Sequence, residues 1–217
     1  MRNVYIVTHP EATHHVENIV GGWHDSTLTP RGVEDARRVA ASLRNLLPDY
    51  LPGDNGGTML FSSDLRRTRQ TAETISGLLD LEIIFDPDLR EQSYGAAEGT
   101  PAGSVSHLPP PAQGNRMQHQ DGVEGSETRH VWAGRVYSAL DRILAAGARD
   151  TIVVTHGGSA TYLIAAWIRL PLTAAGYVKF RLSPGSITHL NEDNFYHDRR
   201  VLDLNLTGHL GIPEPRA

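Results

Sequence analysis

The chain contains no cysteine, which excludes a disulfide framework, a cysteine-ligated zinc or iron–sulfur centre and a thiol nucleophile. It also has no basic run of the kind that grips a phosphate backbone: 20 basic against 25 acidic residues leave a net charge of -5, which disfavours nucleic acid as a partner. The longest apolar run, 160–168, is broken by Thr161 and is too short to span a membrane. The N-terminus enters a strand-like run without the apolar region of a signal peptide, which favours a cytoplasmic enzyme or binding protein.

The remaining composition is that of an ordinary folded protein. Hydrophobic residues make up 39% of the 217 positions and charged residues 21%. A chain of this length buries roughly 70% of the surface that its unfolded form exposes, so it needs no metal or disulfide to fold. These values predict one α/β domain over residues 1–217.

Strand-like and helix-like segments alternate along the chain. The run Val4 to Val7 is typical of a strand buried on both faces of a parallel sheet. Further strands are expected at 59–61, 82–85, 151–155, 186–190 and 200–204, the last two as a hairpin or sheet edge. The alternation with helices predicts an open, mostly parallel sheet with helices on both faces.

Capping residues indicate where the first two long helices begin. Thr29 is expected to cap a helix that starts at Pro30 and ends by Pro48. Ser63 or Asp64 is expected to cap a second helix that runs to about residue 79. Two later helices are expected at about 127–146 and 159–169, and Trp167 in the last of them is expected in the core.

Residues 99–125 have no periodic pattern. They contain three consecutive prolines at 109–111, several glycines and scattered glutamine and histidine. Loops of this length in compact domains are usually functional or mobile, so this segment is predicted to be a long loop or lid.

Polar residues follow three of the expected strands. His9 ends the first, the serine pair 62–63 ends the second, and His156 with Gly157 ends the fourth in chain order. Ligands of open α/β sheets bind beyond the carboxyl ends of the strands. The two histidines are therefore expected to converge on one pocket.

Four residues together suggest phosphoryl chemistry, although each alone has an ordinary structural explanation. His9 and His156 taken singly are more often structural residues, Arg67 belongs to a basic helix start, and Glu91 alone is a surface carboxylate. As a set, they can bind a phosphoryl group, attack it with an imidazole nitrogen and protonate the leaving alcohol.

The order of the motifs and the residues within them resemble those of a known family. The matching segments are Thr8-His9-Pro10-Glu11-Ala12, Gly22-Trp23-His24-Asp25, 62–72 (SSDLRRTRQTA), Leu89-Arg90-Glu91 with Tyr94-Gly95, Val153 to Gly158, and the tail 204–210. In this order and spacing the chain resembles the histidine phosphatase superfamily, whose members are phosphoglycerate-mutase-like, over almost its whole length.

The resemblance implies a role for each matching position. His9 would be the nucleophile that becomes phosphohistidine, and Arg67 and His156 would clamp the phosphoryl oxygens. Glu91 would protonate the leaving oxygen and then activate water, which requires a raised pKa. The phosphate- or substrate-binding positions would include Thr8, His15, Gly22 and Gly157. The implied partner is a small phosphorylated metabolite, and no metal or other cofactor is implied.

Three positions depart from the family pattern. Thr8 replaces the first arginine, Pro10 replaces the glycine after the nucleophile, and His15 stands where asparagine is usual. Charge-assisted hydrogen bonds are worth roughly 1.5–3 kcal/mol each, so the missing guanidinium would slow the reaction by one or more powers of ten. We hypothesise that a protonated His15 or His14 partly replaces the lost charge. The alternatives are that both are merely polar loop residues, or that another arginine enters the site.

Three functions remain open at this stage. A phosphatase is preferred over a mutase, because a mutase usually adds basic residues to its pocket and residues 99–125 contain only Arg116. A catalytically weakened binding or regulatory protein is the third possibility. A serine hydrolase is disfavoured because the segment after His156 lacks the second glycine of the nucleophile elbow. A metal site is disfavoured because the His14–His15 pair has no partner at helical spacing, and no pattern specifies the substrate or the oligomeric state.

Overall fold

The computed structural model describes residues 1–47 and 57–211, so the expected helix end at Pro48 lies outside the described residues. One six-stranded sheet has the order β3-β2-β4-β1-β5-β6. The strands are β1 (Arg2–Thr8), β2 (Thr58–Ser62), β3 (Ile83–Phe85), β4 (Asp150–Thr155), β5 (Ile187–Glu192) and β6 (Arg199–Leu206). Strands β3, β2, β4 and β1 are parallel, whereas β5 and β6 add an antiparallel edge. The expected open, mostly parallel sheet is confirmed.

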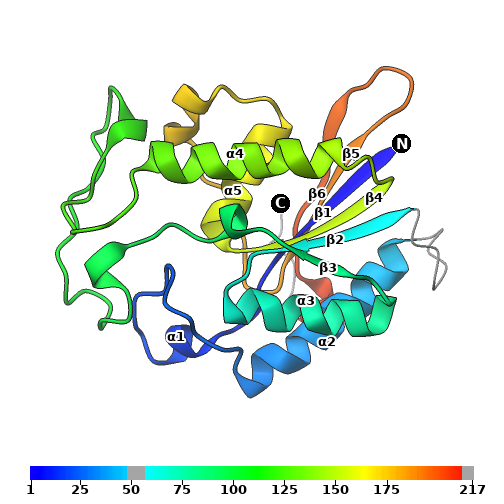
Figure 1. Cartoon of the computed structure of the whole chain (residues 1–217), viewed down its shortest axis with the longest axis horizontal. Helices are drawn as coiled ribbons and strands as arrows, with labels where there is room; N and C mark the ends of the chain where they lie inside the picture. The colour runs from blue at the N-terminus through cyan, green and yellow to red at the C-terminus, as the bar shows by residue number, and fades with distance from the viewer. Residues whose placement is uncertain (48–56, 212–217) are drawn as a thin grey trace.

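Helices cover both faces of the sheet, as Figure 1 shows. One face carries α2 (Pro30–Leu46) and α3 (Arg66–Leu79), and the other carries α4 (Arg129–Ala145) and α5 (Gly157–Trp167). The short helix α1 (Thr13–Val16) lies in the loop after β1. Short 3-10 turns occupy Pro87–Leu89, Gly95–Ala97, Arg116–Gln118, Leu172–Tyr177 and Gly208–Leu210. No helix among the described residues is long and apolar enough to cross a bilayer.

The N-cap expected from the sequence is confirmed for α2 but not for α3. Thr29 accepts the N–H of Gly32 at 3.0 Å and caps α2, as expected. The prediction for α3 was wrong, because its N-cap is Leu65, and the carboxylate of Asp25 accepts the N–H of Arg66 at 2.7 Å. Ser63 and Asp64 have other partners: the hydroxyl of Ser63 contacts His156, and the carboxylate of Asp64 receives two hydrogen bonds from Arg90.

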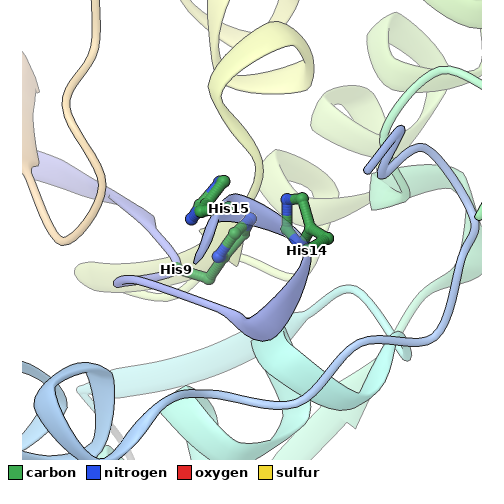
Figure 2. A group of neighbouring side chains, drawn as sticks. All are labelled: His9, His14 and His15. Carbon is green, nitrogen blue, oxygen red and sulfur yellow. The ribbon is translucent and has the colours of Figure 1, made fainter. Parts of the chain in front are cut away.

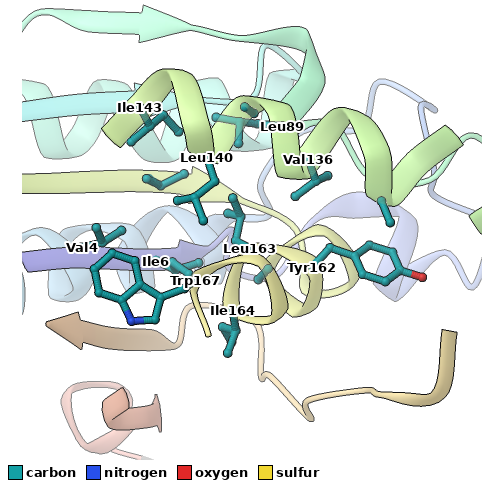
Figure 3. Close-up of a cluster of buried hydrophobic side chains, with 14 of the residues drawn as sticks. Val4, Ile6, Leu89, Val136, Leu140, Ile143, Tyr162, Leu163, Ile164 and Trp167 are labelled. Atoms are coloured by element: carbon teal, nitrogen blue, oxygen red, sulfur yellow. The ribbon is translucent and has the colours of Figure 1, made fainter. Parts of the chain in front are cut away.

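Alternating side chains of the strands build a hydrophobic core on each face of the sheet. Val4 and Ile6 of β1 pack with α4 and α5, in the cluster drawn in Figure 3. Tyr5 of β1 belongs to the opposite cluster, formed with α2 and α3. Trp167 is fully buried in the first cluster, which confirms its expected place in the core.

The register of the sheet brings three strand ends together. Thr8 of β1 lies opposite Thr155 of β4, and Ser62 of β2 lies opposite Val154 of β4. The residues that follow these three strands therefore emerge at the same edge of the sheet. This is the edge at which ligands of open α/β folds bind.

Residues 99–125 form the expected long loop. They are irregular except for the 3-10 turn Arg116–Gln118, and most of them are exposed. Its neighbour α4 starts at Arg129, two residues later than expected, with Thr128 as its cap.

Candidate active site

All eight positions selected from the sequence line one cavity of about 280 Å³ at the carboxyl edge of the sheet. They are Thr8, His9, His15, Gly22, Arg67, Glu91, His156 and Gly157. They come from the ends of β1 and β4, the short helix α1, the starts of α3 and α5 and two loops, so the fold gathers residues that are far apart in the chain.

His9 follows β1 and is held by a hydrogen bond to the backbone. Its Nδ1 lies 2.8 Å from the carbonyl oxygen of Pro10, and because a carbonyl only accepts, Nδ1 carries the proton. The lone pair of the neutral ring is therefore on Nε2. Burial, followed by the charge of Arg67, lowers the pKa of His9 well below its usual range. Nε2 is consequently unprotonated at neutral pH and has the free lone pair that a nucleophile needs.

Arg67 is fixed beside this nitrogen. Its Nε donates to Nε2 of His9 at 3.2 Å, and its Nη1 and Nη2 donate to the carbonyl oxygens of His24 at 2.8 Å and Gly22 at 2.6 Å. Burial lowers the pKa of Arg67 to about 10, so the guanidinium remains charged at neutral pH. Gly22 has a φ of 53°, and a Cβ there would lie 2.8 Å from the carboxylate of Glu98. Glycine at this position therefore helps to place the guanidinium.

His156 occupies the N-cap position of α5 without a side-chain cap, and its ring centroid lies 5.1 Å from that of His9. Its Nε2 is 2.9 Å from the hydroxyl of Ser63, whereas its buried Nδ1 has no hydrogen-bond partner among the described residues. Burial lowers its pKa well below the usual range, so the ring is neutral. An unpaired buried nitrogen is costly, and an anion held next to His9 would give Nδ1 an acceptor.

Glu91 is held by backbone donors at the other side of the cavity. Its Oε2 accepts the N–H of Gly158 at 2.9 Å and its Oε1 that of Gln92 at 3.0 Å. Burial raises the pKa of Glu91, while these two bonds and the charges of Arg67 and Arg135 oppose the rise. The raised pKa favours the protonated form that a general acid requires.

Arg135 of α4 holds the segment that carries Glu91. Its guanidinium donates to the backbone oxygens of Asp88, Arg90 and Glu91 at 2.9, 2.7 and 2.6 Å. It also makes a two-pronged contact with the carboxylate of Glu127 at 2.9 and 2.8 Å. This single side chain ties helix α4 to the backbone around the candidate acid.

Thr8 lines the cavity, but its hydroxyl is engaged elsewhere. It donates to the carbonyl oxygen of Ser183 at 2.6 Å and accepts the N–H of Ser186 at 3.1 Å. The one proton of this hydroxyl is thus not free for a bound phosphate, contrary to the role expected for Thr8. Pro10 lacks an N–H, yet its carbonyl orients the nucleophile.

The surroundings of His14 and His15 work against the expected positive charge. Burial, followed by neighbouring positive charge, lowers the pKa of His14 to about 3 and also lowers the pKa of His15. These shifts favour the neutral imidazole at both positions over the protonated one that the hypothesis requires. The Nδ1 of His15 accepts the N–H of Ala12 at 3.2 Å, so its neutral ring carries the proton on Nε2. His15 offers a neutral N–H donor instead of a charge.

A second cavity of about 610 Å³ adjoins the first and shares Glu91, Tyr94 and Gly157 with it. Four cationic side chains, of which only Arg116 had been considered from the sequence, are among the lining residues: Arg116, Arg129, Lys179 and Arg181. Among the described residues, Lys179 and Arg181 have no hydrogen-bond or ion-pair partner. Lys179 and Arg181 alternate with apolar residues at 178–182, a local signal that the sequence analysis did not use.

The family model of the histidine phosphatase superfamily (branch 1) matches residues 4–205. The chain belongs to the histidine phosphatase superfamily. Its relatives include a protein named probable phosphoglycerate mutase GpmB from Yersinia pestis (strain Pestoides F). This relative is 31% identical over 221 residues, which cover 98% of this chain and 97% of the relative.

Solved structures share the histidine phosphatase fold. A mycobacterial glucosyl-3-phosphoglycerate phosphatase has a TM-score of 0.75 at 23% identity, covering 95% of this chain and 100% of that one. An alpha-ribazole phosphatase from Shigella flexneri has a TM-score of 0.72 at 22% identity, covering 94% and 96%. At these identities the likeness establishes the shared fold, and the family assignment makes the chain a phosphoryl-handling enzyme of the phosphatase and mutase type.

Proposed function

We propose that this histidine phosphatase superfamily member hydrolyses a small phosphomonoester through a phosphohistidine on His9. The observation that carries the proposal is the tautomer of His9. Its Nδ1 donates to the carbonyl of Pro10, which leaves the lone pair of Nε2 beside the guanidinium of Arg67. A nucleophilic nitrogen next to a fixed cation is the arrangement that attack on a phosphoryl group requires.

In the first step, Nε2 of His9 attacks phosphorus, and the bond from phosphorus to the leaving oxygen breaks. The proton of Glu91 passes to that oxygen, so that an alcohol leaves. Arg67 and Nδ1 of His156 stabilise the charge on the phosphoryl oxygens, and Nε2–H of His15 adds a neutral donor. We propose that this donor partly replaces the arginine that Thr8 lacks.

In the second step, water attacks the phosphorus of phosphohistidine. The carboxylate of Glu91 accepts a proton from the water, and the phosphorus–nitrogen bond breaks to release inorganic phosphate and free His9. The raised pKa of Glu91 supports both roles, because the carboxyl group must exchange its proton during each turnover.

Water access favours hydrolysis over transfer. No residue of the 99–125 loop lines the cavity around His9, and only Arg116 of that loop reaches the adjoining cavity. A mutase must keep water from its phosphoenzyme, which needs a cover over the nucleophile. We therefore place phosphatase ahead of mutase.

The mutase alternative rests on two observations. The relative from Yersinia pestis is named a probable phosphoglycerate mutase, and the adjoining cavity is lined by four cations, more than the sequence suggested. The free cations Lys179 and Arg181 also support a substrate that carries a second anionic group beyond the phosphoryl group. We propose a small phosphorylated metabolite of this kind as the substrate.

Phosphate release from a panel of phosphomonoesters, with and without a second carboxylate or phosphate, tests the proposal. Wild type is compared with His9→Asn and with His130→Asn, the latter altering an exposed histidine on α4. Free phosphate from wild type and His130→Asn, together with an acid-labile phosphoenzyme that His9→Asn lacks, is the expected result. Isomerised phosphoesters in place of free phosphate would favour the mutase. Binding without either reaction would favour the weakened binding or regulatory protein.

A further inference from the structure

The side chains of His9, His14 and His15 lie close together, as Figure 2 shows, and all three line the cavity of about 280 Å³. One ring nitrogen from each of His9, His14 and His15 lies within 4.8 Å of the corresponding nitrogens of the other two. The His14 and His15 centroids are 4.0 Å apart, and the rings of His9 and His15 are nearly parallel at 5.6 Å. The sequence disfavours a metal site because His14 and His15 have no partner at helical spacing. The fold supplies a third histidine, His9.

We propose that His9, His14 and His15 form a binding site for a zinc ion. We further propose that zinc bound there blocks the nucleophile, a consequence that rests on the proposed function of His9. Zinc would thus act as a reversible inhibitor of the enzyme rather than as its cofactor.

The donor set suits zinc. Neutral imidazole is a common zinc ligand, and three protein ligands with a fourth position open to water form a recognised type of zinc site. Zinc has no geometric preference from its d electrons, so it tolerates a site that was not shaped for it.

Outer hydrogen bonds already orient two of the three rings. Nδ1 of His9 donates to the carbonyl of Pro10, and Nδ1 of His14 lies 2.7 Å from the hydroxyl of Ser26. Partners of this kind on the far ring nitrogen are a regular feature of histidine-ligated metals, because they fix the ring and leave the other nitrogen for the ion.

A modest rearrangement would close the site. Zinc–nitrogen bonds of roughly 2.0–2.1 Å in a tetrahedron place the ligand atoms about 3.3 Å apart, closer than the present limit of 4.8 Å. His15 is exposed and lies in the four-residue helix α1, so its ring has room to turn. Turning would give up only the long bond of 3.2 Å from the N–H of Ala12.

Two features bear on the consequence of binding. Nε2 of His9 is the lone pair that attacks phosphorus, so a zinc ion on this nitrogen removes the nucleophile. Nε–H of Arg67 donates to the same lone pair at 3.2 Å, so zinc must displace this hydrogen bond, and the guanidinium charge opposes a second cation there. Zinc should therefore bind reversibly and be removed by a chelator.

Equilibrium dialysis of zinc-free protein against zinc chloride, without substrate, tests the site directly. We expect one zinc ion per wild-type chain and at least tenfold weaker binding in His14→Gln and in His15→Asn. His130→Gln is the matched control, because it removes an exposed histidine from α4 and should bind zinc as wild type does. Thermal melting of each variant checks that the fold is retained, and His15→Asn changes an exposed residue that the fold does not need.

Zinc binding that is absent, or that persists unchanged in both variants, would overturn the proposal. The inhibitory consequence is read separately, as a chelator-reversible loss of phosphoenzyme formation with zinc. If zinc binds as expected but the zinc-free protein forms no phosphoenzyme, the proposed function fails while the metal site stands. If phosphoenzyme forms and zinc does not bind, the metal site fails alone.

Discussion

Nε of Arg67 donates to Nε2 of His9 over 3.2 Å, so the cation that would hold the phosphate also touches the atom that would attack it. Arg67 belongs to helix α3 and His9 to the loop that follows β1, so this hydrogen bond joins two distant parts of the chain. The positive charge helps to keep His9 unprotonated, and the carbonyls of Gly22 and His24 keep the guanidinium in place. The proposed nucleophile and the proposed phosphate-binding cation are therefore positioned as one unit.

Arg67→Lys should lower kcat/KM by about 100-fold, because lysine cannot reproduce the fork of donors that reaches His9 and two carbonyls. Steady-state phosphate release measures the effect. Arg69→Lys, on the exposed side of the same helix, is the control and should behave as wild type. An equal loss in both variants would show that the contact with His9 is not what matters.

Glu91→Gln should reduce kcat by about 100-fold or more, because an amide can neither donate the proton to the leaving oxygen nor accept one from water. The pKa of Glu91 is raised by burial, so its protonated form persists to higher pH than for an ordinary carboxyl. Wild-type phosphorylation should consequently fall as pH rises past this raised pKa. The rate of phosphoenzyme formation measured across pH checks this decrease. If the same decrease at high pH survives in Glu91→Gln, it belongs to another group.

Gly158→Ala should displace Glu91, because a Cβ at this position would lie 2.5 Å from both Oε1 of Glu91 and the ring of Trp132. Overpacking of this kind typically costs about 1–3 kcal/mol, and we expect at least a tenfold loss of kcat as well. Gly134→Ala is a matched control in α4, where an added Cβ meets nothing within 4 Å. It should stabilise the protein by about 0.5–1 kcal/mol and leave kcat unchanged. Thermal melting and kinetics on both variants decide the matter, and a fully active Gly158→Ala would contradict the packing argument.

Arg135 should act on catalysis by positioning Glu91 rather than by touching substrate. Arg135→Lys keeps the charge but loses the fork to three backbone oxygens, so kcat should fall about tenfold with little change in KM. Arg135→Met also removes a charge that lowers the pKa of Glu91, so the fall in phosphorylation rate at high pH should move to higher pH. Arg142→Met, which changes an exposed arginine on the same helix, should leave both kcat and this fall in rate unchanged. A higher KM with unchanged kcat would instead indicate substrate contact.

The strands, the helices and the membership of the site follow from local patterns in the sequence. The apolar run before His9 predicts a buried strand, and Thr29 before Pro30 predicts the start of α2, because both signals depend on neighbouring residues. The ends of parallel strands must meet at one edge, so His9 and His156 were expected in one pocket. All eight selected positions lie there.

The tertiary structure alone decided which hydrogen bonds and which protonation states the site side chains adopt. The hydroxyl of Thr8 donates to the carbonyl oxygen of Ser183, a residue 175 positions away. The hydroxyl of Ser63 contacts His156 instead of capping α3. Desolvation and the nearby charge of Arg67 lower the pKa of His14 and His15, whereas the sequence suggested charge. Protonation and hydrogen bonding depend on which groups the fold brings within a few ångströms, and local sequence does not encode those distances. For the same reason, only the fold could join His9 to the histidine pair.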